Sequence, residues 1–529
     1  MKLAARSVLV LLALYGLVFA IGDAYLASDG APLWLAVLFA LGVVALQFAV
    51  GPRLIEWLMS ISWDDDKSCL PARNREFLER LCAERGLKMP RIGIIHSDTP
   101  NAFTFGHVPW NARVVVSSGL YETLTPEETN AVLAHEMGHV EHWDFVVMTV
   151  AAVVPLILYQ IYAFGRRRRD GWAIAIGAYL CYVVSEFLVL LLSRTREYAA
   201  DEYSATVTGH ADNLATGLVK IAYGMVRADG QIREALQHAD AEEKSRLQGE
   251  RHRMGSLALM GISNIRSGAA LALSASPAAA AGVMRWDLVN PWAKVYELSS
   301  THPLTALRIR ALNRISEAKS QPIQYPLPED RQIRWNGFAT EFLMWIAPWI
   351  STGLFAAAML GWFADVAPEW TRLGPLFLML AGMTWLLRIA YRYAGSFHSS
   401  DVETLLQDVE VSQMRPRAVR LEGEILGRGV PGVFWCPDLV LADATGRIYM
   451  LYRSSIPLAR LFFALSEAEQ YVGQKVVVEG WFRRGLSPYV EMSCLTDAQG
   501  KTHRSYSRWI QSGVASVAVI AGGYWWLLS

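Results

Sequence analysis

The chain has 529 residues, of which 53% are hydrophobic, and its mean hydropathy is +0.23. This composition is too apolar for a typical soluble enzyme and predicts a membrane protein, for which the lipid bilayer is the first partner. Lysine plus arginine and aspartate plus glutamate both number 49, so no basic field points to nucleic acid as a partner. The five cysteines are an odd number without CxxC spacing, which argues against a disulfide framework and suits a mostly cytosolic exposure: Cys69, Cys82, Cys181, Cys436 and Cys494.

Apolar runs near the length of about 20 residues that spans a bilayer occur seven times along the chain. The first run follows Lys2 and Arg6, but it is too long for a typical signal core and leads into a second run, so we expect a retained helix. The seven predicted spans are approximately 7–27, 33–50, 145–164, 172–192, 338–363, 373–391 and 510–528.

Two polar segments, about 53–144 and 194–335, lie on either side of the third and fourth spans. The first segment contains strand-like runs at Arg91–Ile95 and Arg113–Val116. We therefore expect one polar domain that is split by a membrane hairpin. The short interval before span three predicts that the last helix of the first segment runs directly into the membrane.

That helix begins near Thr125, because Thr125-Pro126-Glu127-Glu128 supplies an N-cap hydroxyl, a proline at the first position and a capping-box glutamate. It contains His135-Glu136-Met137-Gly138-His139, the pattern HExxH. Two imidazoles four residues apart share one helical face and can bind one metal ion, while Glu136 can reach a metal-bound water. A surface helix with two solvated histidines is the alternative.

A catalytic zinc usually takes three protein ligands and leaves one position for water. Glu197 is the best candidate for the third ligand, with Glu202 next. Glu197 and Asp201 are four residues apart, so on a helix Glu197 can bind metal while Asp201 accepts a hydrogen bond from a ligand imidazole. An ordinary acidic pair on a solvated helix is the alternative, which the spacing alone leaves open.

The sequence resembles the membrane-embedded zinc metallopeptidases that include HtpX and the CAAX-prenyl endopeptidases, over roughly residues 70 to 315. Many matches in the family's order are far more specific than any single one. The matching pieces are Asn101-Ala102-Phe103 with Gly106, Ser118-Gly119-Leu120, Leu124-Thr125-Pro126-Glu127-Glu128, HExxH with Asp144, Ser193-Arg194 with Arg196-Glu197-Tyr198 and Ala200-Asp201, and Thr301-His302-Pro303 with Arg308.

The resemblance implies one Zn²⁺ per chain, held by His135, His139 and Glu197, with Glu136 as the catalytic base. It implies that Asp201, Asp144 and Arg308 support these ligands. It also places Asn101, Ala102 and Phe103 on a strand edge beside the cleft, to which an extended substrate could add. His302 is the candidate for stabilising the oxyanion; a structural histidine before Pro303 is the alternative.

Residues after about 320 have no counterpart in the short HtpX-like enzymes. Within 393–508 the hydrophobic period changes toward two. Five strands and a short helix near Leu458–Gln470 predict a small OB-like β-barrel. Arg483-Arg484 beside Trp481 would be the pattern for single-strand binding, but we favour contact with a protein partner or a regulatory role. The predicted strands are Ala418–Ile425, Phe434–Leu441, Ile448–Leu451, Lys475–Trp481 and Tyr489–Leu495.

We expect a mainly α polytopic membrane protein with a split HExxH peptidase domain and a C-terminal barrel. The predicted activity is zinc-dependent endopeptidase cleavage of protein or peptide substrates, with membrane proteins under quality control as the expected targets. CAAX-type processing, or a membrane scaffold with an idle site, are the alternatives. The expected segments are 1–52, 53–144, 145–193, 194–335, 336–392, 393–508 and 509–529.

Lys2 and Arg6 predict a cytoplasmic N-terminus, and alternating seven spans then places both polar segments and the barrel in the cytoplasm. We therefore expect a bacterial inner (cell) membrane protein whose active site faces the cytoplasm. Arg166–Arg169, in the turn between spans three and four, contradict this orientation, because the positive-inside rule disfavours arginines outside.

Overall fold

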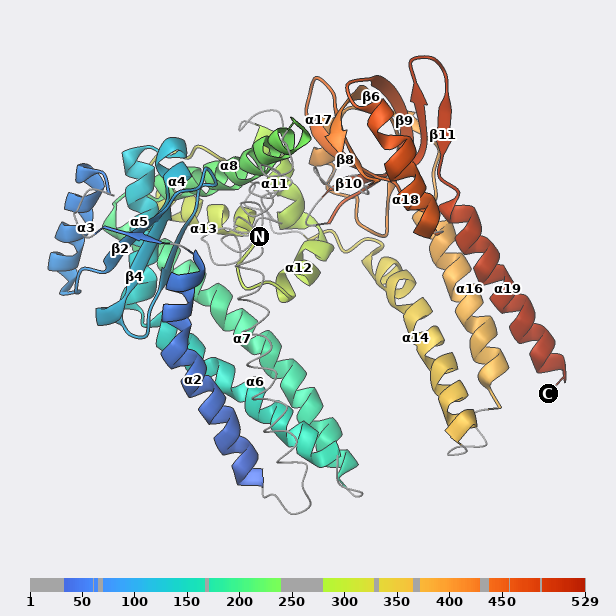
Figure 1. Ribbon diagram of the computed structural model, residues 1–529, viewed down its shortest axis with the longest axis horizontal. Helices are drawn as coiled ribbons and strands as arrows, with labels where there is room; N and C mark the ends of the chain where they lie inside the picture. Colours follow the sequence, from blue (N-terminus) through green and yellow to red (C-terminus); the bar gives the residue numbers. More distant parts are fainter. Residues whose placement is uncertain are drawn as a thin grey trace. The chain divides into compact units, whose positions relative to one another are not determined.

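A computed structural model gives the arrangement of the chain (Figure 1). Two compact units are formed, and each contains two stretches of sequence. Unit 1 comprises Met1–Gly268 and Tyr296–Leu327, and unit 2 comprises Ala269–Val295 and Pro328–Ser529. The residue boundaries of the seven expected segments stay a prediction. The structure describes residues 33–59, 61–64, 70–166, 171–238, 279–327, 333–364, 372–428, 437–455, 457–485 and 488–528.

Unit 1 contains a small sheet in the order β1-β2-β4-β3. The central strands β2 and β4 are parallel, and β1 and β3 are antiparallel to their neighbours. Both strands expected from the sequence of the first polar segment are confirmed, as β2 and β4, and β3 lies at one edge of the sheet. The bounds are β1 (Ser62–Trp63), β2 (Arg91–Ile95), β3 (Ala102–Phe105) and β4 (Arg113–Ser117).

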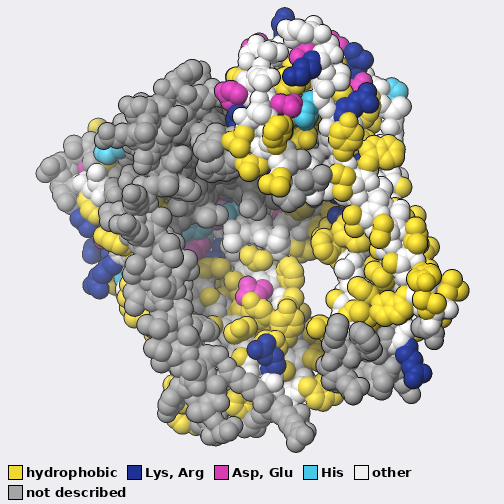
Figure 2. Space-filling view, turned by 45° about the vertical axis from the view of Figure 1, so that its right-hand side comes forward, with side chains coloured by type: hydrophobic (Ala, Val, Ile, Leu, Met, Phe, Trp, Pro, Cys, Tyr) yellow, Lys and Arg dark blue, Asp and Glu magenta, His cyan; other side chains and the backbone are white. Residues whose placement is uncertain are grey.

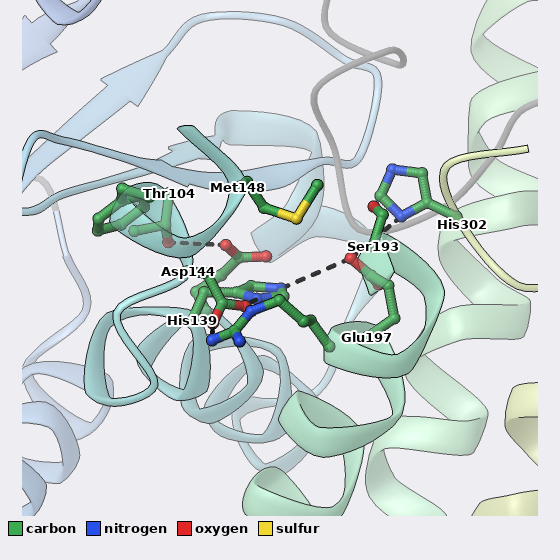
Figure 3. A pocket seen from close by; sticks show the side chains of 10 residues that line it. Thr104, His139, Asp144, Met148, Ser193, Glu197 and His302 are labelled. Atoms are coloured by element: carbon green, nitrogen blue, oxygen red, sulfur yellow. Dashed lines mark hydrogen bonds and ion pairs between the residues drawn. The ribbon is translucent and has the colours of Figure 1, made fainter. Parts of the chain in front are cut away.

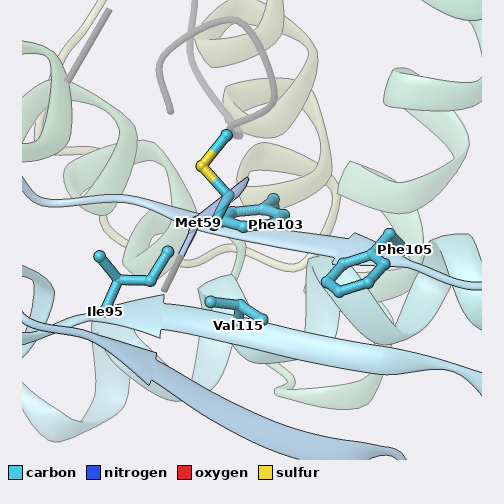
Figure 4. Close-up of a cluster of buried hydrophobic side chains, with 5 residues drawn as sticks. All are labelled: Met59, Ile95, Phe103, Phe105 and Val115. Atoms are coloured by element: carbon cyan, nitrogen blue, oxygen red, sulfur yellow. The ribbon is translucent and has the colours of Figure 1, made fainter. Parts of the chain in front are cut away.

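Apolar side chains from three strands pack on one face of this sheet with the end of a membrane helix (Figure 4). Met59 is the last residue of α2 (Leu33–Met59), and its side chain lies over the strands. The sheet is therefore anchored to the membrane part of unit 1. The other buried members of the cluster are Ile95, Phe103, Phe105 and Val115.

The HExxH sequence lies in α5 (Pro126–Glu141), whose N-terminus has the expected capping box. The Thr125 hydroxyl accepts from the Glu128 N–H at 3.3 Å, and the Glu128 carboxylate accepts from the Thr125 N–H at 2.9 Å. The expectation that this helix runs straight into the next span is wrong. Trp143 has φ of 59°, and this left-handed residue turns the chain between α5 and α6 (Asp144–Arg166). α6 therefore starts in a new direction.

The remaining helices of unit 1 complete the domain around α5. α7 (Trp172–Val207) is 36 residues long, so it starts in the membrane beside α6 and ends against α5. Gly138 permits this approach, because a Cβ there would lie 3.1 Å from the Ala200 Cα. The other helices are α3 (Ala72–Arg85), η1 (Pro109–Asn111), α4 (Ser118–Thr123), α8 (Ala211–His238) and α13 (Thr305–Ala318).

Among the described residues, five helices are long and apolar enough to cross a membrane, by length and composition. They contain the second to sixth predicted spans. The first predicted span, 7–27, lies outside the described residues, as do Arg167–Arg169. The seventh forms α19 (Ser507–Leu528), which is helical but not among the five, since tryptophan, tyrosine and glycine reduce its hydropathy. The five spans are Val37–Met59, Asp144–Arg166, Trp172–Val207, Phe338–Gly361 and Gly374–Arg392.

In unit 2, α16 (Gly374–Arg392) packs against both α14 (Phe338–Ala364) and α19. Two glycines bring α16 and α19 close together: a Cβ at Gly382 would lie 2.6 Å from the Ala515 carbonyl oxygen. Gly522 has a similar contact with Met379. Hydrophobic side chains cover these helices in Figure 2, and charged side chains gather on the barrel above them. Unit 2 also contains α11 (Ala280–Val289) and α17 (Val402–Gln407), and α12 (Pro291–Leu298) contains the boundary between the units.

The C-terminal polar segment forms a closed five-stranded barrel, in the order β6-β7-β8-β10-β9 and back to β6. Only the β8–β10 pair of this ring is parallel, and α18 (Pro457–Ser466) follows β8. This is the OB arrangement that the sequence predicted. Two short strands, β5 (His398–Ser399) and β11 (Thr502–Arg504), extend the sheet. The barrel strands are β6 (Arg417–Arg428), β7 (Leu439–Ala442), β8 (Arg447–Leu451), β9 (Lys475–Arg483) and β10 (Tyr489–Asp497).

The aromatic and basic residues near the end of β9 are buried. Trp481 and Phe482 are 6% and 0% exposed, as expected for barrel core, and Arg483 and Arg484 are 0% and 1% exposed. These two arginines therefore do not form a basic surface for a nucleic acid strand. Predicted strand residues Phe434–Cys436 lie outside the described residues, and a protein partner at the barrel stays a prediction.

Candidate active site

Three potential metal ligands from α5 and α7 meet at one point in unit 1. Figure 3 shows two of them, His139 and Glu197. The Nε2 atoms of His135 and His139 lie 3.2 Å apart. Glu197 Oε2 lies 3.7 Å from His135 Nε2, and Glu197 Oε1 lies 3.7 Å from His139 Nε2. Within the described residues, this is the cluster of His, Cys, Asp and Glu side chains whose geometry suits a metal ion.

One ligand atom from each of the three residues lies within 4.8 Å of the other two, so all three can reach one zinc ion. Bonds of 2.0–2.1 Å to nitrogen and oxygen give ligand-to-ligand distances of about 3.3 Å. Glu197 is 6% exposed, and its Oε2 is buried without a hydrogen bond in the described part of the chain. A buried carboxylate oxygen beside two imidazole nitrogens is a donor set that a divalent cation would satisfy.

Each histidine is oriented by a carboxylate at its other ring nitrogen. His135 Nδ1 lies 3.0 Å from Asp201 Oδ1, and His139 Nδ1 lies 2.6 Å from Asp144 Oδ2. With a proton on Nδ1, each ring presents its Nε2 lone pair to the centre of the cluster. The structure thus brings together Asp201 and Asp144 with the ligands they were expected to support.

Two arginines hold these carboxylates in place. Arg308 is 2% exposed, donates to Asp201 at 2.9 and 2.6 Å, and lies 3.3 Å from Glu197 Oε2. Burial alone would lower the pKa of Arg308, but the carboxylates of Asp201 and Glu197 raise it, so the guanidinium stays charged. Arg196 pairs with Asp144 in the same way. The role of Arg196 was missed from the sequence, because the contact joins the start of α6 to the interior of α7.

Glu136 projects into the pocket beside the ligand cluster. It is 2% exposed, and its Oε2 accepts a hydrogen bond of 2.7 Å from the hydroxyl of Thr104. Thr104 lies on the edge strand β3 and was not singled out from the sequence, although strand alternation turns it away from Phe103 and Phe105. The pocket is lined by Thr104, Glu136, His139, Asp144, Phe145, Met148, Ser193, Arg196, Glu197 and His302.

The expected substrate strand is only partly placed at the pocket. Asn101 and Ala102 are buried and do not line the pocket, and Phe103 packs in the cluster on the sheet. Thr104 is the residue of β3 that lines it. His302 contacts the third ligand, with its Nδ1 at 3.2 Å from Glu197 Oε1 (Figure 3). Only its Nε2 is then left to face a substrate, and its oxyanion role stays a prediction.

Residues 71–316 match the family model described as Peptidase family M48. The chain is 35% identical over 226 residues to "Protease HtpX homolog" of Methanothermobacter thermautotrophicus. The matched region covers 42% of this chain and 86% of the relative. It is 36% identical over 207 residues to the "Protease HtpX homolog" of Moorella thermoacetica, covering 36% and 68%.

Among solved structures, the chain is similar to Ste24p from S. mikatae, with a TM-score of 0.36 and 16% identity over 58% of this chain and 65% of that one. The family-model match contains the HExxH helix, and the match to the first relative covers 86% of that relative. The chain therefore belongs to peptidase family M48, and it is a membrane metallopeptidase.

Proposed function

We propose that the protein is a zinc endopeptidase that cleaves damaged or misassembled membrane proteins at the cytoplasmic face of the bacterial cell membrane. One observation carries this proposal: His135, His139 and Glu197 form a zinc-sized cluster, and Glu136 projects into the same pocket. The pocket also contains residues from the first turns of α6, so it lies next to a membrane span.

His135, His139 and Glu197 would hold a zinc ion, which would lower the pKa of a bound water and polarise the scissile carbonyl. The residues of the chain supply the remaining steps. Glu136 accepts the proton of the attacking water and later delivers it to the leaving amine. Thr104 fixes the carboxylate of Glu136 through its hydroxyl. Asp201 and Asp144 keep both imidazoles in the orientation that presents Nε2.

Features of the pocket support an extended, partly apolar substrate segment. β3 is an edge strand, so a peptide can pair with its main chain beside Glu136. Phe145 and Met148, from the start of α6, form an apolar wall of the same pocket. Segments next to a membrane span in a misassembled protein combine an exposed backbone with apolar side chains.

CAAX-type processing is the second candidate within the same chemistry. The relatives' name, protease HtpX homolog, favours general proteolysis over it. A scaffold with an idle site is disfavoured by the interlocked contacts of the cluster. Arg308 bridges two carboxylates, Glu197 and Asp201, that each contact a histidine. Burying these charges has a desolvation cost, which an idle site would have no reason to keep.

Substrate trapping tests the proposed function. Membrane fractions from cells that produce Glu136→Gln should retain membrane proteins that the wild type degrades, and these should copurify with the variant. The matched control is Glu127→Gln, an exposed glutamate on the same helix. Enrichment of prenylated substrates alone would select CAAX processing, and identical proteomes in all three strains would reject quality control.

Thr104→Val is expected to lower kcat by about tenfold, because a hydrogen bond to a charged carboxylate is lost while the volume of the side chain is kept. Zinc content should not change, since Thr104 contacts Glu136 and not the ligands. Steady-state cleavage of a fluorescent casein would measure the effect. Thr104→Ser should restore most of the rate, and equal loss in both variants would show that the hydroxyl has no such role.

The cytoplasmic orientation predicts the accessibility of introduced cysteines. In a cysteine-free background, Glu127→Cys on α5 and Glu422→Cys on the barrel should resist a membrane-impermeant maleimide in intact cells and react after lysis. Both native side chains are exposed, so burial would not explain protection. Labelling of both from outside would invert the orientation and give weight to the arginines at 166–169.

A further inference from the structure

Four arginines and one glutamate gather where the last turn of α16 meets the barrel in unit 2. Arg388 and Arg392 are one helical turn apart on α16. Arg483 ends β9, and Arg453 follows β8. The glutamate is Glu491, on β10. Arg392, Arg453 and Arg483 act on Glu491, and the same three arginines act on Arg388, so four positive charges and one negative charge gather at the end of a membrane span.

Arg483 and Glu491 form a hydrogen-bonded ion pair. Arg483 Nε donates to Glu491 Oε2 at 2.9 Å, while its other nitrogens donate to the carbonyls of Gln413 and Arg392 at 3.1 and 2.6 Å. Tyr393 donates to the second oxygen of Glu491 at 2.5 Å. Burial alone would raise the pKa of Glu491, but the neighbouring guanidiniums of Arg483, Arg392 and Arg453 lower it, so it remains ionised.

The guanidinium groups of Arg388 and Arg392 have too few carboxylate partners among the described residues. Arg392 reaches Glu491 only at 3.6 Å, and its Nε is buried without a hydrogen bond in the part of the chain that the structure describes. Arg388 has two such nitrogens, Nε and Nη1, among the described residues. Arg392, Arg483 and Arg453 act on Arg388 with like charge, and Tyr393, which acts in the opposite sense, is a neutral phenol at pH 7.

A further carboxylate near Arg453, that of Asp438, does not correct this imbalance. Asp438 lies within electrostatic range of Arg453, but burial raises its pKa and it accepts the Tyr452 N–H at 3.1 Å. Burying unpaired guanidinium nitrogens is costly. The cluster therefore lacks an anion with several acceptor oxygens.

The surroundings indicate where that anion comes from. Arg388 lies 5.0 Å above the ring of Trp385, and Tyr393 packs edge-on against Trp481 at 4.8 Å. Tryptophan and tyrosine rings beside arginines at a helix end are typical of the level of lipid headgroups in a bilayer. Basic pockets at this level bind anionic headgroups, and the guanidinium fork matches phosphate oxygens.

We propose that Arg388 and Arg392, assisted by Arg453, bind a phosphate group at the end of α16, and that an anionic phospholipid headgroup supplies it. The bound phosphate accepts from the guanidinium nitrogens of Arg388 and Arg392 that have no hydrogen bond among the described residues. The lipid then connects the membrane helix to the base of the barrel.

Lipid retention by the full-length protein tests the proposal. Protein purified in detergent and stripped of lipid is mixed with phosphatidylglycerol, phosphatidylcholine or inorganic phosphate, and binding is followed by native mass spectrometry and by Tm. The wild type should retain phosphatidylglycerol in preference to phosphatidylcholine. Arg388→Gln should weaken this retention about fivefold, the usual contribution of one surface arginine.

Arg388 makes no hydrogen bond in the described part of unit 2, so its replacement should leave the lipid-free Tm unchanged or raise it by removing repulsion. Arg388→Lys keeps the charge and should keep most of the binding. Arg53→Gln is the matched control, an exposed arginine near the end of the separate span α2.

The proposal would be overturned if Arg53→Gln weakened phosphatidylglycerol retention as much as Arg388→Gln, or if both lipids were retained equally. Either result would mean general attraction to the membrane surface. A rise of Tm with inorganic phosphate that Arg388→Gln abolishes, without a preference for phosphatidylglycerol, would support the phosphate site and assign it to a soluble phosphate. Absence of any binding that depends on Arg388 would reject the site.

Discussion

Glu136→Gln should lose cleavage activity by about a hundredfold or more and keep its zinc. The amide fits the same space and can still accept the hydrogen bond from Thr104. It cannot take a proton from water, and loss of a general base costs about 10²–10⁴ in rate. Casein cleavage by the purified protein in detergent measures the rate, and elemental analysis measures the zinc. Glu127→Gln on the same helix should behave as wild type.

Two outcomes would contradict this account of Glu136. Substantial cleavage by Glu136→Gln would show that another group accepts the proton. Loss of zinc from the same variant would show that Glu136 supports the metal site, so that its effect on rate says nothing about proton transfer.

His139→Ala and Glu197→Ala should each lose the metal, because either change leaves only two protein ligands. Asp201→Asn should keep a zinc site with about 10- to 100-fold weaker affinity, since it disturbs the orientation of His135 and not a ligand atom. Zinc stoichiometry after equilibrium dialysis against a metal buffer measures both effects. Glu202→Ala is the matched control, because Glu202 is exposed in the same helix.

Full zinc occupancy in Glu197→Ala would show that Glu197 is not the third ligand. The alternative from the sequence, Glu202, is a poor substitute: it is exposed, whereas Glu197 is buried beside both histidines. Metal loss in Glu202→Ala but not in Glu197→Ala would contradict the observed arrangement of α7.

The arrangement of the ligands was predictable because it depends on local geometry. His135 and His139 are one turn apart, as are Glu197 and Asp201, so each helix presents its pair on one face wherever the helix lies. Thr104 and Arg196 were not found, because their contacts join elements that only the tertiary fold brings together. Strand alternation was the one local signal available for Thr104.

Errors elsewhere arose where the sequence pattern does not determine the packing. No turn signal marks Trp143, whose left-handed backbone ends α5, so the bend before α6 was missed. The alternation of barrel strands predicted an OB-like fold, and five strands close as expected. Arg483 and Arg484 would be solvated in most chains, yet here they are buried, because the helix end and α11 provide carbonyl acceptors.

The central claim is that cleavage requires zinc at the His135, His139 and Glu197 cluster. Casein cleavage by the wild-type protein, measured after removal of metal by a chelator and again after addition of zinc, tests this claim most directly. The account predicts that cleavage disappears in the metal-free protein and returns with about one zinc ion per chain. Undiminished cleavage by protein that elemental analysis shows to be free of metal would contradict it.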